Sequence, residues 1–142
     1  MTPIDVVVPV YGGAETTRRC LDSVLAATSR TPFELVIVND ASPEPDLVRY
    51  MRELAARGRA TLIEQATTQG CAAALNRAFA RHRDRDKVVL QSDAFVAGDW
   101  LDRLAHHALA RDAGVLGVRG ETPFPISPDS VVPTQTPSAI RP

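Results

Sequence analysis

Short apolar runs alternate with longer amphipathic segments over residues 4–111 of the 142-residue chain. Residues 4–10 (IDVVVPV) and 33–38 (FELVIV) are rich in β-branched residues and almost continuously apolar, which is typical of strands covered on both faces. Residues 60–65 (ATLIEQ) and 87–92 (KVVLQS) show weaker forms of the same pattern. The sequence therefore predicts a strand at each of these places.

Each predicted strand is followed by a segment whose apolar positions recur at helical spacing. The expected helices cover residues 14–27, 43–57, 70–83 and 100–111. For the second helix, Ser42 offers an N-cap, Pro43 a first helical residue and Glu44 an acid in the first turn, while Gly58 ends the helix. The residues expected to face inward on the third helix are Ala74, Leu75, Ala78 and Phe79.

The alternation of strand and helix defines the fold class. Its connections are too long for hairpins, so we expect an α/β, Rossmann-like, mostly parallel sheet with right-handed crossovers and helices on both faces. Ligands of such sheets bind at the carboxyl ends of the strands. The segments that follow those ends are residues 10–13, 39–42, 66–70 and 91–93, and three of them carry polar groups that a core would not hold.

Beyond about residue 114 the pattern becomes thin. Residues 115–120 (VLGVRG) are a candidate fifth strand, whereas residues 121–142 hold six of the eleven prolines and no sustained period. Proline lacks a backbone donor and resists both helix and central strand. We therefore expect one folded domain over residues 1–120 and a Pro-rich, irregular tail over residues 121–142. The alternative is a chain truncated in mid-domain.

Composition narrows the partners and the compartment. Sixteen basic and seventeen acidic side chains give a net charge of −1, so neither nucleic acid nor an anionic membrane is required as a partner. No apolar run approaches the roughly 18 residues of a transmembrane segment, and the N-terminus lacks a signal-peptide pattern. Cys20 and Cys71 lie in predicted helices and are expected to be reduced core thiols. These features favour a cytoplasmic protein, with peripheral contact to a membrane left open.

Four motifs together resemble one known family. IDVVVPVYGG, ELVIVNDASP, GCAAALNRAF and VVLQSDAFVAGDWLDRL occur in the order and near the spacing of the nucleotide-binding half of the family 2 glycosyltransferases. The resemblance covers residues 4–118, and the last motif is the most specific. It implies the GT-A fold, a nucleotide-diphospho-sugar donor and transfer of the sugar with inversion to a carbohydrate, lipid or protein acceptor.

The resemblance also implies a set of donor-binding residues. In the family, a turn after the first strand lies beside the nucleotide, and an acid after the second strand contacts the base or ribose. A segment at the start of the third helix lies along the nucleotide, and a shortened Asp-x-Asp motif after the fourth strand binds ribose and metal. The matching residues of this chain are Pro9, Tyr11, Asp40, Gly70, Asn76, Gln91, Ser92 and Asp93.

Asp93 is the metal ligand that the resemblance implies. A divalent cation bridging the two phosphates stabilises the leaving group when the sugar–phosphate bond breaks. Mg²⁺ or Mn²⁺ prefers oxygen ligands, retains several waters and needs few protein carboxylates, so one aspartate suffices together with the phosphates. A carboxylate at the end of a rigid strand would also be held in place without the ordering of a loop.

Each of these assignments has a structural alternative. Asp93 is suited to a turn after a strand, and Asp40 to a cap on the turn that follows it. Tyr11 would pack at a strand end instead of stacking on a base, Gly70 would serve only the turn, and Asn76 would face solvent. The histidines lack metal-ligand spacing and are expected on helix surfaces: His82, His106 and His107.

The chain departs from the family pattern at two motif positions, and it also lacks the part of the family's sequence that carries the acceptor site. Gln91 replaces the first acid of the Asp-x-Asp motif, and Thr68 replaces an asparagine before Gly70. The acceptor site and the general base, an Asp or Glu, normally lie beyond the point where this sequence stops, so no catalytic residue is assigned.

Two alternatives to an active transferase remain at this stage. One is a catalytically silent nucleotide-sugar-binding module or a truncated remnant that lacks the acceptor site and the general base, a missing half that another chain or a second copy would supply. The other is a different doubly wound domain, such as a receiver or a dinucleotide-binding module. It is disfavoured because no Gly-x-Gly-x-x-Gly follows the first predicted strand.

Overall fold

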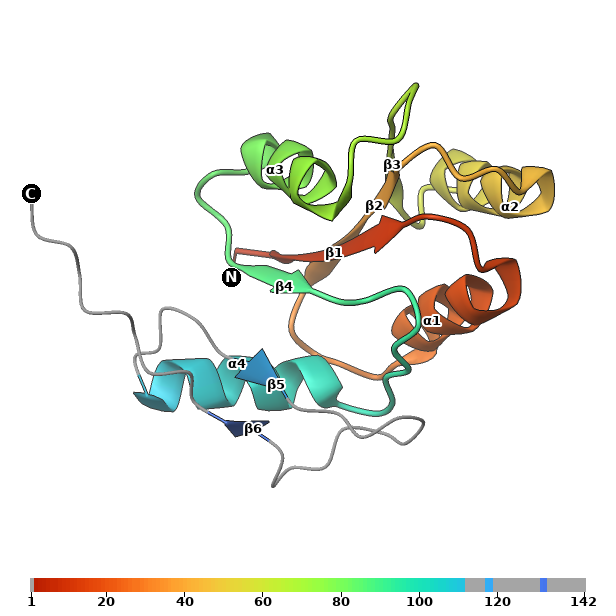
Figure 1. Cartoon of the computed structure of the whole chain (residues 1–142). Helices are drawn as coiled ribbons and strands as arrows, with labels where there is room; N and C mark the ends of the chain where they lie inside the picture. The colour runs from red at the N-terminus through yellow and green to blue at the C-terminus, as the bar shows by residue number, and fades with distance from the viewer. Residues whose placement is uncertain (1, 112–116, 119–130, 133–142) are drawn as a thin grey trace, which may run out of the picture.

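Four parallel strands form the central sheet, in the order β3-β2-β1-β4 (Figure 1). The computed structural model describes residues 2–111, 117–118 and 131–132. The strands of this sheet are β1 (Ile4–Val10), β2 (Phe33–Asn39), β3 (Thr61–Glu64) and β4 (Lys87–Val89). The helices are α1 (Ala14–Ala26), α2 (Pro45–Ala56), α3 (Cys71–Arg81) and α4 (Trp100–Arg111). The predicted α/β fold with a parallel sheet is confirmed.

The helices divide unequally between the two faces of the sheet. Successive residues of a strand point to opposite faces. Val6 and Val8 pack in one core cluster with buried residues of α1, α2 and α4, whereas Val7 packs in another with Ala74 of α3. Over the described residues, the second face is thus covered by α3 alone. Val89 of β4, which is in register with Val7, is consequently 45% exposed.

Helix α2 begins two residues later than predicted, with Glu44 as its N-cap and Pro45 in its first turn. The Glu44 carboxylate makes no cap for α2. It accepts hydrogen bonds from the backbone N–H groups of Gly13 (2.7 Å) and Ala14 (3.0 Å), so it caps the start of α1 instead. The predicted end of α2 is confirmed, because Gly58 has a φ of 70°, the left-handed conformation in which glycine ends helices.

Two residues predicted to be in the core lie at the surface. Cys20 is buried as expected, but Cys71 is exposed, so the prediction of a second core thiol is wrong. Phe79 is also exposed, although it is predicted to face inward. Ala74 and Ala78, four residues apart, form the buried stripe of α3, and Phe79 lies about 100° around the helix from Ala78.

A second, small sheet pairs β5 (Gly117–Val118) with β6 (Val131–Val132) in antiparallel fashion. β5 lies within the segment predicted as a fifth strand. β6 lies within the segment predicted as an irregular tail, and the other residues of 121–142 are outside the described part of the chain. The domain boundary near residue 120 stays a prediction.

No helix over residues 2–111 is both long and apolar enough to cross a membrane. The compartment of the protein stays a prediction.

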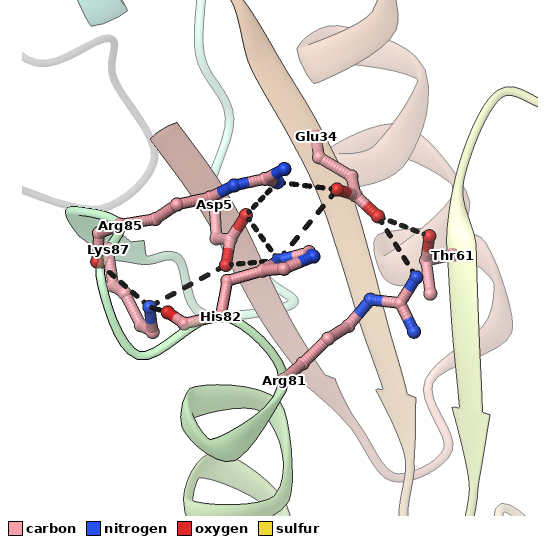
Figure 2. A network of polar contacts seen from close by, with 7 residues as sticks. All are labelled: Asp5, Glu34, Thr61, Arg81, His82, Arg85 and Lys87. Atoms are coloured by element: carbon pink, nitrogen blue, oxygen red, sulfur yellow. Dashed lines mark hydrogen bonds and ion pairs between the residues drawn. The ribbon is translucent and has the colours of Figure 1, made fainter. Parts of the chain in front are cut away.

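A network of charged side chains holds the amino ends of the strands together (Figure 2). Asp5, near the start of β1, is fully buried, and its carboxylate lies 3.1 Å from Arg85 Nη1, 3.0 Å from His82 Nδ1 and 3.6 Å from Lys87 Nζ. Glu34, its register partner on β2, accepts a hydrogen bond of 2.7 Å from Arg85. The prediction that His82 lies on a helix surface is therefore wrong. It directly follows α3, and its ring points into this network.

Glu34 is ionised more easily in this network than in water. Its partial burial alone would raise its pKa, but hydrogen bonds from Thr61 and Arg85, with the nearby charges of Arg81 and His82, lower the pKa below its ordinary value. A carboxyl whose pKa is lower in the folded state stabilises the fold above its unfolded pKa. That stabilisation is lost as the pH falls through the folded pKa.

Replacing Asp5 by Asn is expected to lower the free energy of unfolding by about 3 kcal/mol at pH 7, because it removes the fully buried charge that the partly buried Arg85 and Lys87 pair with. Urea denaturation measures the change. The matched control is Asp46→Asn, which removes one partner of the exposed Asp46–Arg49 pair and should change stability by less than about 1 kcal/mol. Equal effects of the two substitutions would show that the network does not stabilise the fold.

The contribution of Glu34 should depend on pH. We expect the stability difference between the wild-type chain and Glu34→Gln to be constant above about pH 5 and to shrink as the pH falls below about 4.3, where the unfolded carboxyl takes up its proton. Urea denaturation of both proteins over a pH series checks this. A difference that stays constant down to pH 3 would contradict the lowered pKa.

Candidate functional site

The order of the strands reverses beside β1. From β1 the chain adds β2 and then β3 on one side and afterwards adds β4 on the other side. In open parallel sheets, ligands bind outside the carboxyl ends of the strands at such a reversal. The two strands concerned are β1, which Tyr11 follows, and β4, which residues 91–93 follow. Two of the predicted donor-binding segments therefore flank the reversal.

Pro9 ends the pairing of β1 with β4. The backbone N–H groups of β1 face β2 and β4 in turn, as the bonds donated by Ile4 and Asp5 show. By this alternation, the N–H that Pro9 lacks is one that would face β4. The last bond of the ladder runs from the N–H of Leu90 to the carbonyl of Val7. As a result β4 has three residues, half the predicted length, and the chain leaves the sheet beside Pro9.

The sequence predicts Asp93 at the rigid end of a strand, and this is wrong: β4 ends at Val89, and Asp93 lies in a turn four residues farther on. The N–H of Ala94 donates to the carbonyl of Gln91 at 3.0 Å, which closes a turn with Ser92 and Asp93 at its corners. The Asp93 side chain is exposed, and within the described residues no hydrogen bond or ion pair engages its carboxylate. Tyr11, after β1, is 59% exposed. An aromatic ring and a carboxylate, both accessible, thus follow the two strands at the reversal.

Asp40 is buried and holds the loop between β3 and α3. Its Oδ1 accepts hydrogen bonds from Gln65 Nε2 (2.7 Å) and Gln69 N–H (2.8 Å), and its Oδ2 accepts one from Gly70 N–H (3.0 Å). Gly70 has φ 93° and ψ 165°, a conformation that is nearly exclusive to glycine. The structure therefore brings Asp40 and Gly70 together. Gln65 was not predicted, because it ends a weak strand and no pattern marks it.

The remaining predicted residues differ in their surroundings. Asn76 is exposed on α3, Gln91 is exposed in the turn, Ser92 is partly buried, and Pro9 is partly buried in β1. Thr68, which departs from the family motif, donates a hydrogen bond of 3.2 Å to the backbone carbonyl of Asp40. The roles of all these residues toward a ligand stay predictions.

Another candidate for metal binding lies at the opposite ends of the strands. Asp5, Glu34 and His82 offer ligand atoms that all lie within 4.8 Å of one another. This group lies at the amino ends of the strands (Figure 2), whereas the predicted site follows their carboxyl ends. Arg85 and Lys87 already direct positive charge at the same carboxylates. Since a metal ion there would meet like charges, we interpret the group as an ion-pair network.

A surface groove lies along α2, where Pro43, Val48 and Arg52 are among its lining residues. None of the predicted donor-binding residues lines it. We therefore assign no ligand to this groove.

The chain belongs to glycosyl transferase family 2, whose family model matches residues 5–130. The resemblance predicted from the four motifs is thus confirmed. The family match decides against a receiver or a dinucleotide-binding domain. No curated protein matches the sequence.

Solved glycosyltransferase structures share the fold. TarS 1–349 from S. aureus in complex with UDP-GlcNAc matches 89% of this chain with a TM-score of 0.68 and 16% identity. GalNAc-T7 with UDP, GalNAc and Mn²⁺ matches 82% with a TM-score of 0.66 and 21% identity. The mannosyltransferase PcManGT from Pyrobaculum calidifontis in complex with GDP-Man and Mn²⁺ matches 72% with a TM-score of 0.55 and 30% identity. The predicted GT-A-type fold is confirmed.

The chain spans only part of these structures. It covers 37% of the TarS 1–349 chain, 22% of the GalNAc-T7 chain and 30% of the PcManGT chain. The similarity therefore concerns only the sheet and helices that this chain contains. The activity of a complete protein is proposed below.

Gly70→Ala is expected to lower the free energy of unfolding by about 1–3 kcal/mol, since its backbone conformation excludes a Cβ atom. No atom lies within 4 Å of the position that the Cβ would take, so the cost comes from the backbone and not from a clash. Gly98→Ala is the control, because Gly98 has an equally open surrounding but a φ of 59°, near the left-handed region that other residues reach. Urea denaturation should show the larger loss for Gly70→Ala, and the reverse order would contradict this account of the loop.

Proposed function

We propose that this chain is the donor-binding part of a glycosyltransferase, which binds a nucleoside diphosphate sugar and a divalent metal between the carboxyl ends of β1 and β4. One observation carries the proposal. The exposed Asp93 carboxylate, without a partner among the described residues, follows the strand at the reversal in a chain of family 2. The UDP-GlcNAc in TarS and the GDP-Man in PcManGT support a nucleotide-linked donor.

The Asp93 turn fits a divalent metal. Mg²⁺ and Mn²⁺ take oxygen ligands and keep part of their water shell, and Asp93 is an exposed residue whose carboxylate has no hydrogen-bond or ion-pair partner among the described residues. Gln91 adds no charge, so the diphosphate oxygens would supply further ligands. When bound, the metal offsets the negative charge that develops on the diphosphate leaving group. The Mn²⁺ in GalNAc-T7 and in PcManGT supports this choice of ion.

The other residues would bind and orient the nucleotide. The ring of Tyr11, which is exposed, would stack on the base. Asp40 holds the β3–α3 loop in the conformation that Gly70 permits, and the Gly70 backbone, which carries no side chain, would allow the nucleotide to approach it closely. Gln91 and Ser92 offer polar groups to the ribose, and Asn76 lies on the helix that this loop begins.

Transfer of the sugar with inversion is the reaction that we propose for the complete protein. It requires a general base for the proton of the acceptor hydroxyl, and we assign that role to no described residue. The acceptor is a carbohydrate, a lipid or a protein. The alternative is a donor-binding module that depends on another chain, or on a second copy of this one, for its acceptor site. Formation of a glycosylated product by this chain alone, from a panel of donors and acceptors, would exclude that alternative.

Asp93→Ala is expected to weaken the Mn²⁺-dependent binding of a nucleoside diphosphate at least about tenfold, which corresponds to about 1.4 kcal/mol. Isothermal titration calorimetry with UDP and with GDP, each with and without Mn²⁺, measures the effect. The loss should be confined to the titrations that contain Mn²⁺, because the carboxylate acts on the nucleotide through the metal.

Asp99→Asn is the matched control. Asp99 is exposed six residues farther on and pairs with Arg103 at 3.1 Å, so its substitution should leave nucleotide binding unchanged. If Asp93→Ala binds each nucleotide as tightly as the wild-type chain does in the presence of Mn²⁺, the metal role of Asp93 is refuted. If the wild-type chain binds no nucleoside diphosphate at all, the donor-binding function itself is wrong.

A further inference from the structure

Residues 90–99 carry Asp93 but form neither helix nor strand. The ladder between β1 and β4 ends with the bond from Leu90 to Val7, three residues before Asp93. The turn closed by Gln91 and Ala94 fixes only its own four residues. Something outside this segment must therefore set where the turn lies relative to the sheet, because an untethered loop would sample many positions.

Helix α1 contacts the segment on both sides of the Asp93 turn. The thiol of Cys20 donates a hydrogen bond to the carbonyl of Gln91, with Sγ and O 3.5 Å apart. One helical turn farther, Ser23 Oγ accepts a hydrogen bond of 3.2 Å from the N–H of Val96. Cys20 is fully buried and Ser23 is 7% exposed, so water does not replace these contacts.

Ser23 joins the two contacts into one unit. Its hydroxyl donates to the carbonyl of Cys20 at 2.7 Å and so has a lone pair left for Val96. The Cys20 thiol stays protonated and able to donate at neutral pH, since burial and the negative charge of Asp93 raise its pKa to about 12. Cys20 thus offers a donor to the carbonyl of Gln91, and Ser23 offers an acceptor to the N–H of Val96.

The connection after α1 holds the far end of the same segment. The N–H of Thr28 donates to the carbonyl of Gly98 at 2.9 Å, and the Ser29 hydroxyl accepts a hydrogen bond of 3.3 Å from the N–H of Leu101. The segment is therefore tethered to α1 and its connection at residues 91, 96 and 98, and the start of α4, which follows the segment, is tethered at residue 101. The first two of these contacts enclose Asp93.

We propose that Cys20 and Ser23 are positioning residues, which hold the turn bearing Asp93 in place at the reversal of the strand order. The consequence for metal–nucleotide binding rests on the proposed function, whereas the positioning itself does not. Neither residue touches the ligand. They act by limiting the positions that the Asp93 carboxylate can take before the metal arrives, which reduces the ordering needed on binding.

The positioning can be tested without any ligand. Ser23→Ala removes the acceptor of the buried Val96 N–H, and hydrogen exchange measured by NMR should be at least about tenfold faster at Val96 and Ala94 than in the wild-type chain. The matched control is Leu54→Ala on α2, a buried residue that makes no hydrogen bond to the segment. It should lower the melting temperature while exchange at Val96, relative to other core amides, stays as in the wild-type chain.

The consequence for binding is tested with Mn²⁺ and UDP, and with Mn²⁺ and GDP, as probes. Cys20→Ala and Ser23→Ala should each weaken Mn²⁺-dependent binding about fivefold, the effect of about one net hydrogen bond. Cys20→Ser keeps a donor at the same position and should bind within about twofold of the wild-type chain. Leu54→Ala should keep the wild-type affinity, which separates positioning from a general loss of stability.

The outcomes separate this proposal from the one on which it builds. Unchanged exchange at Val96 in Ser23→Ala would overturn the positioning role, as would wild-type affinity in Cys20→Ala and Ser23→Ala when the wild-type chain binds the probes. If the wild-type chain binds neither probe, the donor-binding function fails, and exchange at Val96 and Ala94 alone decides whether α1 positions the turn.

Discussion

The backbone of β1 donates hydrogen bonds alternately to β2 and to β4 until Pro9, which has no N–H to donate. The candidate site depends on this gap in the central ladder. Pairing with β2 continues to the end of β1, up to Val10 and Asn39, while pairing with β4 ends at Val7 and Val89. The chain after β4 is thereby released from the sheet where the strand order reverses, and it forms the turn that carries Asp93.

The two ends of the sheet use carboxylates in opposite ways. At the amino ends, Asp5 and Glu34 are matched by Arg85 and its neighbours, so their charges are compensated within the fold (Figure 2). At the carboxyl ends, Asp93 is exposed and unengaged over the described residues. An acidic side chain without a compensating cation is therefore a better indication of a cation site than a cluster of acids that are already paired. For this reason we propose the metal at Asp93 and not in the group formed by Asp5, Glu34 and His82.

Helix α1 links the parts of the carboxyl-end region to one another. Its first N–H groups are capped by Glu44, from the segment before α2, and its buried side chains Cys20 and Ser23 reach the segment after β4. The loop before α3 is held in turn by Asp40, from the segment after β2. The start of α1, the loop before α3 and the segment after β4 are thus each fixed by polar side chains from another part of the chain, which limits the conformations that these connections can sample.

Most of the fold was predictable from sequence because local patterns carry it. The buried strands, the helical spacings and the end of α2 at Gly58 follow from side-chain period and from backbone preferences that each residue has by itself. The segments after the carboxyl ends of the strands were predictable for a related reason, since strand ends are visible in the sequence, and ligands of parallel sheets bind at those ends. The family resemblance then attached roles to Tyr11, Asp40 and Asp93, roles that stay proposals.

The sequence by itself determined the order of elements, the parallel sheet and the family, because these depend on patterns within short windows. Only the tertiary structure decided where the polar side chains go. Glu44 could cap α2 or α1, Asp40 could face a nucleotide or the chain's own amides, and Cys20 could be a mere core thiol or a donor to the Asp93 turn. The choice in each case depends on a partner some 30 to 70 residues away in sequence, and hydrogen-bond geometry at that range exists only once the sheet has brought the segments together.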